Sequence, residues 1–161
     1  MSALPSDHRV LSCAYKQAPN DPQFKVFVLY TGLRRTRVAL RAAARLAAGL
    51  DAGIEIVFPQ VVPYPLPIDQ PPVYWSFWTN RFQTLLEEAE VETRLQVCLY
   101  LCRDRRKAMA SALPPDSIVV IGDRNSWWRR REYRLGRWLR ANGYQVLFVD
   151  RQSFVKEFSH A

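Results

Sequence analysis

The stretch IVVIGDRNSWWRRREYRLGRWL, from Ile118 to Leu139, decides the fold. Its short apolar run before Gly122 predicts a buried strand, and the apolar residues from Trp128 onward recur at helical spacing. A strand that passes through a glycine turn into a helix is the repeating unit of α/β proteins. The start of such a helix is also a common place to bind phosphate, yet tryptophans and arginines follow this turn instead of further glycines.

The same alternation of strand and helix continues across the chain. Apolar runs predict strands at residues 25–30, 54–58, 92–101, 117–121 and 144–149. Helical periodicity predicts helices at 36–50, 73 or 75 to 90, 104 or 105 to 113, and 127–142, the first capped by Thr36 and ended by Gly49 or Gly53. This alternation predicts a single-domain α/β fold with a doubly wound, five-stranded parallel sheet and helices on both faces. We adopt the strand order 3-2-1-4-5.

Two segments flank the α/β domain, which is expected at residues 24–150. Residues 1–23 hold three prolines and show no sustained period, so we expect an N-terminal arm that lies over the domain or is loose. Residues 151–161 form a C-terminal tail. Within the domain, six prolines between residues 59 and 72 predict a long extended connection, because proline disfavours both helix and central strand.

Composition and cysteine usage narrow the class of protein. The 161 residues, 48% of them hydrophobic, suffice for one packed core. The sequence shows neither a basic leader followed by an apolar segment nor an apolar run of about 18 residues, so we expect a cytoplasmic protein. Cys98 and Cys102 lie in an apolar run without neighbouring histidines; we expect them in the core and predict no metal site.

The adopted strand order reverses between the first and the fourth strand. Thr31-Gly32 follows the first of these strands and Gly122-Asp123 follows the other. Ligands of open parallel sheets bind at the carboxyl edge where the order reverses. We therefore expect these two turns to face each other across a candidate binding site.

Four segments carry motifs in a characteristic order. The turn after the first strand is followed by a helix with small and hydroxyl residues at fixed spacing: Gly32, Thr36, Ala39, Leu40 and Ala43. The proline-rich connection, a helix start near Arg103-Asp104 and the strand-glycine run Asp116 to Gly122 come next. Together these segments resemble the universal stress protein family over residues 24–149. The resemblance implies the fold above, a role in the stress response and, for members that bind ATP, a nucleotide at the carboxyl edge.

The positions that hold the nucleotide in that family are altered here. Thr31 stands at the position of the family's aspartate, Leu33 at that of its serine and Asn125 at that of its second loop glycine. Gly136 comes one residue late when counted from Gly122, and it falls inside the helix when counted back from the last strand. Side chains at these positions crowd the approach of phosphates to backbone amides. We expect weak or absent ATP binding and no cofactor.

A small set of residues around the two turns remains as a weak nucleotide or anion site: Thr31, Gly32, Gly122, Arg124, Asn125 and Ser126. Asn125 and Ser126 suit the N-cap of the last helix. The alternative is an anion site formed by the amides of that helix with Arg124 and Arg129 nearby.

The last helix also carries a basic outward face. Its apolar residues Trp128, Leu135, Trp138 and Leu139 are spaced to face the sheet. The arginines expected on the outer side are Arg129, Arg130, Arg134, Arg137 and Arg140, in a chain of net charge +8. A solvated surface explains this face; the alternatives are contact with acidic groups of a partner, such as Glu87 and Glu88, or binding of nucleic acid or anionic lipid.

These observations favour a non-enzymatic, stress-protein-like domain with a degenerate nucleotide site that acts through protein association. Catalysis is not expected, because His8 and His160 lie in the terminal segments and no nucleophile turn is present. The apolar strand from Tyr144 to Val149 is suited to pair with its own copy in a homodimer, as it often does in the family. Two alternatives stay open: a nucleotide- or anion-binding module with altered contacts where the strand order reverses, and a basic surface adaptor for nucleic acid or anionic lipid.

Overall fold

The computed structural model of the 161-residue chain describes residues 24–88, 93–122 and 131–150 in full, and the backbone of residues 8–16 and 130. The strands are β1 (His8–Lys16), β2 (Lys25–Leu29), β3 (Gly53–Val61), β4 (Leu95–Cys102), β5 (Ile118–Gly122) and β6 (Gln145–Val149). The helices are α1 (Leu33–Leu50), α2 (Trp75–Glu88), α3 (Arg105–Ala112) and α4 (Arg130–Ala141). Strands and helices therefore alternate from β2 onward, as the sequence predicts.

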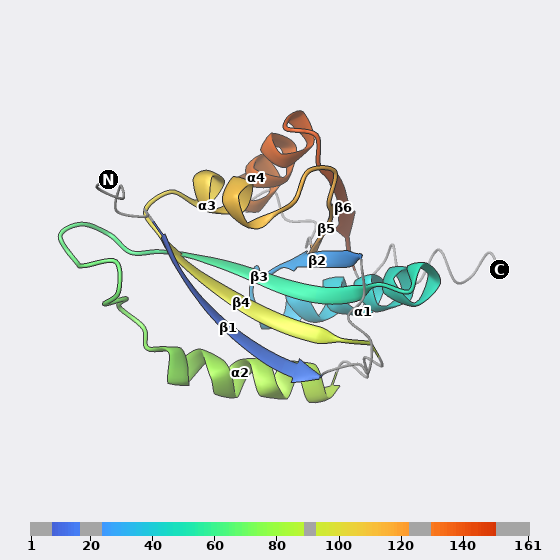
Figure 1. The fold of residues 1–161 in the computed structure, drawn as a ribbon, viewed down its shortest axis with the longest axis horizontal. Helices are drawn as coiled ribbons and strands as arrows, with labels where there is room; N and C mark the ends of the chain where they lie inside the picture. Colours follow the sequence, from blue (N-terminus) through green and yellow to red (C-terminus); the bar gives the residue numbers. More distant parts are fainter. Residues whose placement is uncertain (1–7, 17–23, 89–92, 123–129, 151–161) are drawn as a thin grey trace, which may run out of the picture.

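The strands form one sheet of order β1-β4-β3-β2-β5-β6 (Figure 1). The five strands from β4 to β6 are parallel. Numbered along the chain from β2, their order is 3-2-1-4-5, so the predicted doubly wound parallel sheet is confirmed. The order reverses between β2 and β5, whose carboxyl ends lie next to each other with Leu29 paired to Ile121.

The sixth strand, β1, comes from the segment for which the sequence shows no regular structure. It pairs antiparallel with β4, with His8 opposite Cys102 and Ser12 opposite Cys98. The central part of the expected N-terminal arm is thus an edge strand of the sheet, which corrects the division of the chain at residue 23. The paired residues of β4 lie 79 to 94 residues further along the chain, and a pairing with so distant a strand leaves no local period in the sequence.

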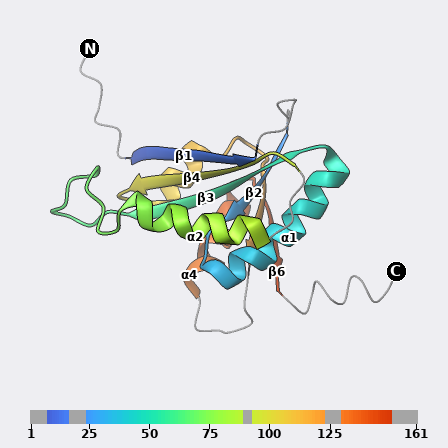
Figure 2. The ribbon, with the colours of Figure 1, turned by 90° about the horizontal axis from the view of Figure 1, so that it is seen from below.

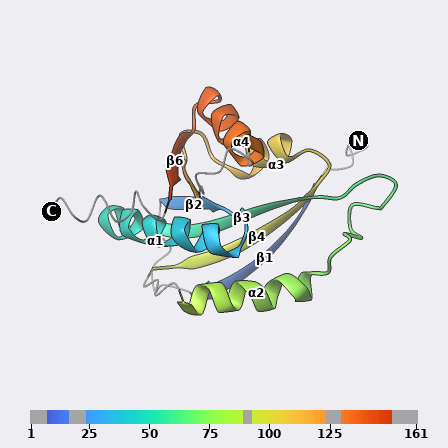
Figure 3. The same ribbon diagram turned by 180° about the vertical axis from the view of Figure 1, so that it is seen from behind.

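Helices cover both faces of the sheet, as predicted. Helices α1 and α2 lie on one face and α3 and α4 on the other, as Figures 2 and 3 show from below and from behind. Alternate residues of β2 serve the two cores: Val26 and Val28 pack with α1 and α2, whereas Phe27 and Leu29 pack with α3 and α4. This alternation follows from the two-residue period of a strand.

The two ends of α1 differ from the prediction. Gly32 is the N-cap, with a φ of 120°, and the helix begins at Leu33, so Thr36 lies one turn inside it. Asp51, with a φ of 51°, is the C-cap in place of Gly49 or Gly53. Asp104 caps α3 by accepting hydrogen bonds from the backbone N–H groups of Arg106 and Lys107.

Strand β3 continues through Pro59 to Val61, although the prolines predict an extended connection from residue 59. The backbone of Val57 bonds toward β2, through the N–H of Tyr30 at 3.0 Å. Pro59 has the same orientation but lies beyond the end of β2, where no strand requires its missing N–H. The loop that follows projects beyond the sheet before α2 begins (Figure 1).

Candidate functional site

The junction of β2 and β5 brings Thr31 and Gly122 together. The Thr31 backbone N–H donates to Oγ1 of Thr36 at 3.1 Å, and the Thr31 hydroxyl donates to the carbonyl oxygen of Gly122 at 3.5 Å. Both threonines are buried. The polar groups of Thr31 thus fasten α1 and β5 to the end of β2, which gives the residue a structural role at the reversal of strand order.

Gly122 and Gly136 are both packing glycines. A Cβ atom on Gly122 would overlap the backbone carbonyl of Arg35, in the first turn of α1. Gly136 lies inside α4, and a Cβ there would overlap the tip of the Phe148 ring and come within 3.2 Å of Ile121. The close approach of α4 to the sheet, and not a phosphate loop, therefore accounts for Gly136.

The turn between β5 and α4 lies outside the described residues. It holds Asp123, Arg124, Asn125, Ser126 and Arg129, and neither the predicted cap nor the alternative anion site at these residues is tested by the structure.

A cavity of about 560 Å³ opens at the carboxyl ends of β2 and β3, and we call it the switch-point cavity. One wall is aromatic and consists of Tyr30, Phe58 and Trp78, with ring centroids 4.5 Å apart for Tyr30 and Phe58 and 4.8 Å for Phe58 and Trp78. The rest of the lining is mostly polar and includes Thr31, Gly32, Gln60, Arg81, Arg105, Arg131 and Glu132. The cavity therefore offers an apolar surface and cationic groups to the same occupant.

Two polar atoms in the lining of this cavity have no hydrogen-bond partner among the described residues. They are Oε1 of Gln60, an acceptor, and Nε1 of Trp78, a donor, and both are buried. A buried polar group without a partner costs about 1–3 kcal/mol. These atoms supply unused hydrogen-bonding capacity in the wall of the switch-point cavity.

The aromatic residues of α2 belong to the core. Phe82 and Leu85 are buried, and Trp75, Trp78 and Leu86 pack against the same core. Trp78 also lines the switch-point cavity, so this residue contacts the core and forms part of the cavity wall. Burial raises the pKa of the neighbouring Tyr30 and the charge of Arg81 opposes this rise, so the phenol stays protonated at neutral pH.

A second cavity of about 540 Å³ lies between α3 and α4, and we call it the α3–α4 cavity. Its lining is mostly cationic: Val61, Arg103, Asp104, Arg105, Arg106, Arg131, Arg134 and Leu135. It shares Val61, Arg105 and Arg131 with the switch-point cavity. The two cavities are therefore neighbours along one arginine-rich edge of the sheet.

Arg105 lies at the junction of these cavities in an unfavourable electrostatic position. Burial lowers the pKa of its guanidinium, Arg131 lowers it further, and Glu132 opposes both effects. Burial is the main cause of this shift, and the smaller contribution of Arg131 reflects repulsion between the two guanidinium groups. An anion bound between Arg105 and Arg131 would remove this repulsion.

Arg103 has a structural role in the same region. Its guanidinium donates to the carbonyl oxygens of Val62 at 2.7 Å and Leu66 at 2.8 Å and lies over the Tyr64 ring at 4.1 Å. These contacts fasten the proline-rich loop to the end of β4.

The predicted basic face of α4 is divided between several roles. Leu135 and Leu139 are buried, as expected. Arg134 lines the α3–α4 cavity, Arg137 lies 6.0 Å from the Tyr133 ring, and Arg140 donates to the carbonyl of Val146 at 2.8 Å. For Arg130 only the backbone is described. Arg134, Arg137 and Arg140 are all exposed, as expected for an outward face, and Arg134 and Arg140 make these specific contacts as well.

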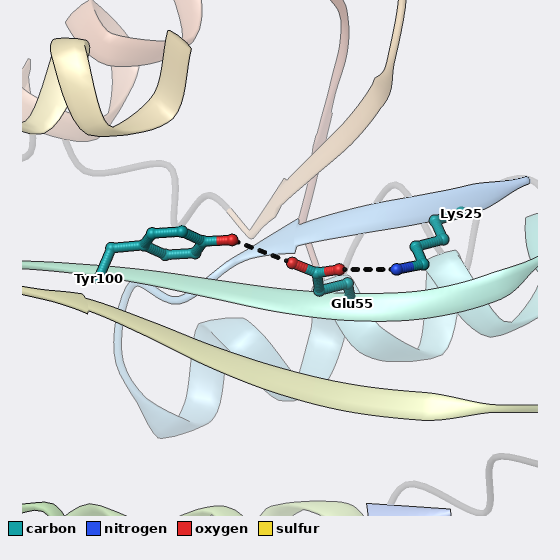
Figure 4. Close-up of polar contacts among 3 residues, drawn as sticks. All are labelled: Lys25, Glu55 and Tyr100. Carbon is teal, nitrogen blue, oxygen red and sulfur yellow. Dashed lines mark hydrogen bonds and ion pairs between the residues drawn. The ribbon is translucent and has the colours of Figure 1, made fainter. Parts of the chain in front are cut away.

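A buried carboxylate, Glu55, lies on the face of the sheet that carries α3 and α4 (Figure 4). One oxygen pairs with Nζ of Lys25 at 3.3 Å, and the other accepts from the Tyr100 hydroxyl at 3.3 Å. This cluster uses both oxygens of the carboxylate and is separate from the two cavities. Because the carboxylate of Glu55 has its counter-charge and its hydrogen-bond donor within the cluster, the cluster has a structural role.

Cys98 and Cys102 are buried free thiols, which confirms the predicted core positions. Burial, reinforced by Glu55, raises the pKa of Cys98 to about 12. Burial raises the pKa of Cys102 to about 11. Both sulfurs are therefore protonated thiols near neutral pH.

Three further observations concern metal-ligating side chains, the acidic residues of α2 and the length of the helices. Among the described residues, no group of three or more His, Cys, Asp or Glu side chains is arranged to hold a metal ion. Glu88, expected to be available to a partner, pairs with Arg37 within the chain. None of the described helices is long and apolar enough to cross a membrane.

The site residues predicted from the sequence do not include Glu55, Gln60, Arg81, Arg105 or Arg131. Glu55 had a signal, since it is a lone charge within an apolar strand run. Arg105 had a weaker one, because it follows directly on a strand end and the carboxyl edge of the sheet is where ligands bind. Arg81 and Arg131 had none, because only the tertiary structure brings their helices to this edge.

No family model matches the chain, and no curated protein matches its sequence. Among solved structures, the chain is similar to a universal stress protein crystallised in complex with cAMP, with a TM-score of 0.49 and 16% identity over 80% of this chain and 98% of that chain. The strand order given above rests on the hydrogen-bonded pairing within this chain.

Proposed function

We propose that this domain is a non-catalytic binding module for a small anionic ligand, held in the switch-point cavity. The observation that carries the proposal is the convergence of Arg81 from α2, Arg105 from α3 and Arg131 from α4 on one cavity. The only carboxylate in the described lining is Glu132. Guanidinium groups bind phosphate and carboxylate in a bidentate manner, so this charge excess favours such a ligand.

The remaining lining supports a ligand that also carries a planar ring. Tyr30, Phe58 and Trp78 provide an aromatic wall, and Gln60 and Trp78 provide an unused acceptor and donor. Small-ligand sites typically combine an apolar wall with a few convergent polar groups, in volumes of about 300–1,000 Å³. A nucleotide meets these requirements through contacts that differ from those of the glycine loop. The stress-response role and the cytoplasmic location stay predictions from the sequence.

The test is ligand-dependent thermal stability, measured with inorganic phosphate, pyrophosphate, AMP and ATP at constant ionic strength. We expect at least one of these anions to raise the Tm of the wild type, because a ligand that binds only the native state stabilises it. The rise should disappear in Arg105→Gln and persist in Arg41→Gln, which removes an exposed arginine of α1. The proposal fails if no anion at about 10 mM shifts the Tm, or if the shift survives in Arg105→Gln.

A second candidate function, homodimerisation through β6, is favoured by the position of that strand. Among the described strands, β6 is an edge strand that pairs only with β5, and Leu147 on it is 42% exposed. An apolar edge strand is a template for pairing with another chain. We expect light scattering to give a dimer mass for the wild type and a monomer mass for Leu147→Lys. Leu50→Lys, at a leucine of α1 that is 51% exposed, is the control that should remain dimeric. A monomeric wild type would rule the dimer out.

A further inference from the structure

The loop that joins β3 to α2 presents an exposed apolar tip, which we call the proline tip and define as residues 63–67, Pro-Tyr-Pro-Leu-Pro. The loop projects beyond the sheet (Figure 1). All five residues of the tip are exposed, Tyr64 to 79% and Leu66 to 37%. The tip holds no charged residue, and Asp69 is the one acidic residue between positions 62 and 74. Exposed apolar surface of this kind is typical of a contact with another molecule or with a membrane.

The residues on each side of the proline tip hold it in place. Val62 and Ile68 pack against β4 in a small separate core. Arg103 donates to the carbonyl oxygens of Val62 and Leu66 and lies over the Tyr64 ring. The exposure of the apolar side chains is therefore built into the fold, and a tip held in this way loses little conformational freedom when it binds.

The backbone of the proline tip has few groups that need water. Three of its five residues are prolines, which have no N–H, and the N–H of Leu66 donates to the carbonyl oxygen of Pro63 at 3.0 Å. The carbonyl oxygen of Leu66 accepts from Arg103 at 2.8 Å. The carbonyl oxygen of Pro67 accepts from the N–H of Gln70 at 3.0 Å. Because burying a polar group without a partner is costly, this backbone enters an apolar medium at a lower cost than that of an ordinary loop.

Cationic groups adjoin the base of the proline tip. Arg103 also lines the α3–α4 cavity, together with four other arginines: Arg105, Arg106, Arg131 and Arg134. No ion pair between described residues involves any of these five arginines, and Asp104 is the one carboxylate of the lining. The tip therefore stands beside positive charge that has little compensation within the described chain.

We propose that the proline tip inserts into the interface of an anionic membrane, with the arginines of the α3–α4 cavity on the lipid headgroups. Tyrosine is favoured at the membrane interface, leucine is favoured in the acyl region below it, and neighbouring arginines are attracted to anionic lipids. A broad negative surface meets the projecting tip and the adjoining arginines at the same time, which favours a membrane over a protein with an apolar pocket. The inference goes beyond the proposed function, since no residue of the tip lines the switch-point cavity.

The test is co-sedimentation of the full chain with two kinds of vesicle, one of phosphatidylcholine and one of phosphatidylcholine and phosphatidylserine in equal parts. We expect the mixed vesicles to bind the chain at least about fivefold more tightly than the neutral ones, because each arginine near an anionic surface contributes roughly this factor. The difference should shrink as salt screens the charges. The proposal fails if the wild type sediments with neither kind of vesicle, and equal binding to both contradicts the contribution of the arginines.

The variant that tests the insertion is Tyr64→Gln/Leu66→Gln, which makes the tip polar without changing its charge. We expect its affinity for the mixed vesicles to fall by about tenfold or more, because removing a large apolar side chain from water contributes at least about this factor. Leu50→Gln is the matched control. This exposed leucine precedes β3 whereas the tip follows it, so the two lie at opposite ends of that strand, and the control should bind as the wild type does.

Circular dichroism establishes that each variant is folded, and the comparison of the two vesicles with the wild type tests the proposal even if the double variant is unfolded. Undiminished binding by a folded double variant would overturn the insertion of the proline tip, since the arginines alone would then account for the association.

Discussion

The cluster of Lys25, Glu55 and Tyr100 and the arginine-lined edge of the sheet are two charged regions built in opposite ways. In the cluster, each oxygen of the buried carboxylate has a partner within 3.3 Å. At the edge, Arg105 and Arg131 lie close enough to lower the pKa of Arg105, and the carboxylates in reach are few.

The difference teaches how to separate structural charge from binding charge in this fold. A buried charge that is matched inside the chain stabilises the fold it belongs to, and removing one partner is costly. A concentration of like charge that the chain leaves unmatched lowers stability until something else neutralises it. The comparison predicts opposite signs for substitutions in the two regions.

The largest effect is expected for Glu55→Ala, which breaks the matched cluster. It leaves the Tyr100 hydroxyl without its acceptor and Lys25 without its counter-charge, so we expect a loss of about 3 kcal/mol in the free energy of unfolding. Urea denaturation measures the change directly. Glu87→Ala, at an exposed glutamate of α2, is the control and should cost less than about 0.5 kcal/mol. A loss below about 1 kcal/mol for Glu55→Ala would contradict the structural role of the cluster.

A smaller effect is expected for Gly122→Ala, which alters the framework of the edge without touching its charges. The added Cβ overlaps the backbone of Arg35, so we expect a loss of about 2 kcal/mol. Gly136→Ala is the matched comparison. There the added atom meets the movable tip of the Phe148 ring, and alanine favours the helix by about 1 kcal/mol, so the loss should be smaller. Equal losses in urea denaturation would show that the two glycines do not differ in this way.

Arg105→Gln is the direct test of the unmatched region, and its expected effect has the opposite sign. Without ligand, it removes the repulsion from Arg131, and we expect a gain of about 0.5–1 kcal/mol, a modest figure because the side chain is only half-buried. Thermal denaturation at low salt measures the gain, which should shrink as salt screens the charges. A destabilised Arg105→Gln would mean that this arginine is matched by contacts of the chain.

The smallest effect is the pH dependence of stability that comes from Cys98, a thiol whose pKa is raised by burial and by Glu55 of the cluster. Its pKa is about 12 in the folded chain against an ordinary value of 9.0, so the folded thiol keeps a proton that the unfolded thiol releases above pH 9. The thiol's contribution is therefore complete below pH 9 and is lost as the pH rises toward 12. At pH 9.5 we expect under about 1 kcal/mol of lost stability. The Tm of Cys98→Ala should fall less steeply with rising pH than the Tm of the wild type. Identical profiles of Tm against pH would contradict the raised pKa of Cys98.

The alternation of apolar runs and helical periods predicted nearly every element of the parallel domain. Where the prediction was wrong, a distant partner was the cause. The strand His8–Lys16 exists because β4 accepts it at the sheet edge, and Pro59 fits β3 because β2 has already ended. Gly32 is the N-cap of α1, and Thr36 lies inside the helix, where its hydroxyl accepts a hydrogen bond from the backbone N–H of Thr31.

The location of the candidate site was predicted from the sequence, but most of the residues that line it were not. The sequence placed it where the strand order reverses, and the structure brings Thr31 and Gly122 together there. Both residues serve packing and fastening in the structure, whereas the charged groups that converge above them come from α2, α3 and α4. Two arginines of α4 also have positions that the sequence does not reveal: Arg134 lines a cavity, and Arg140 donates a hydrogen bond to the carbonyl oxygen of Val146 in β6.

The sequence by itself determined which segments are strands and helices, because the period of apolar residues records how each segment is buried along its own length. It also determined the α/β class, because strict alternation leaves few other arrangements. Only the tertiary structure decided which charges are matched. Glu55 finds Lys25 and Tyr100 across neighbouring strands, while Arg105 meets Arg131 from another helix. Electrostatic interactions depend on distances in space between segments far apart in the chain, and no local pattern of residues contains those distances.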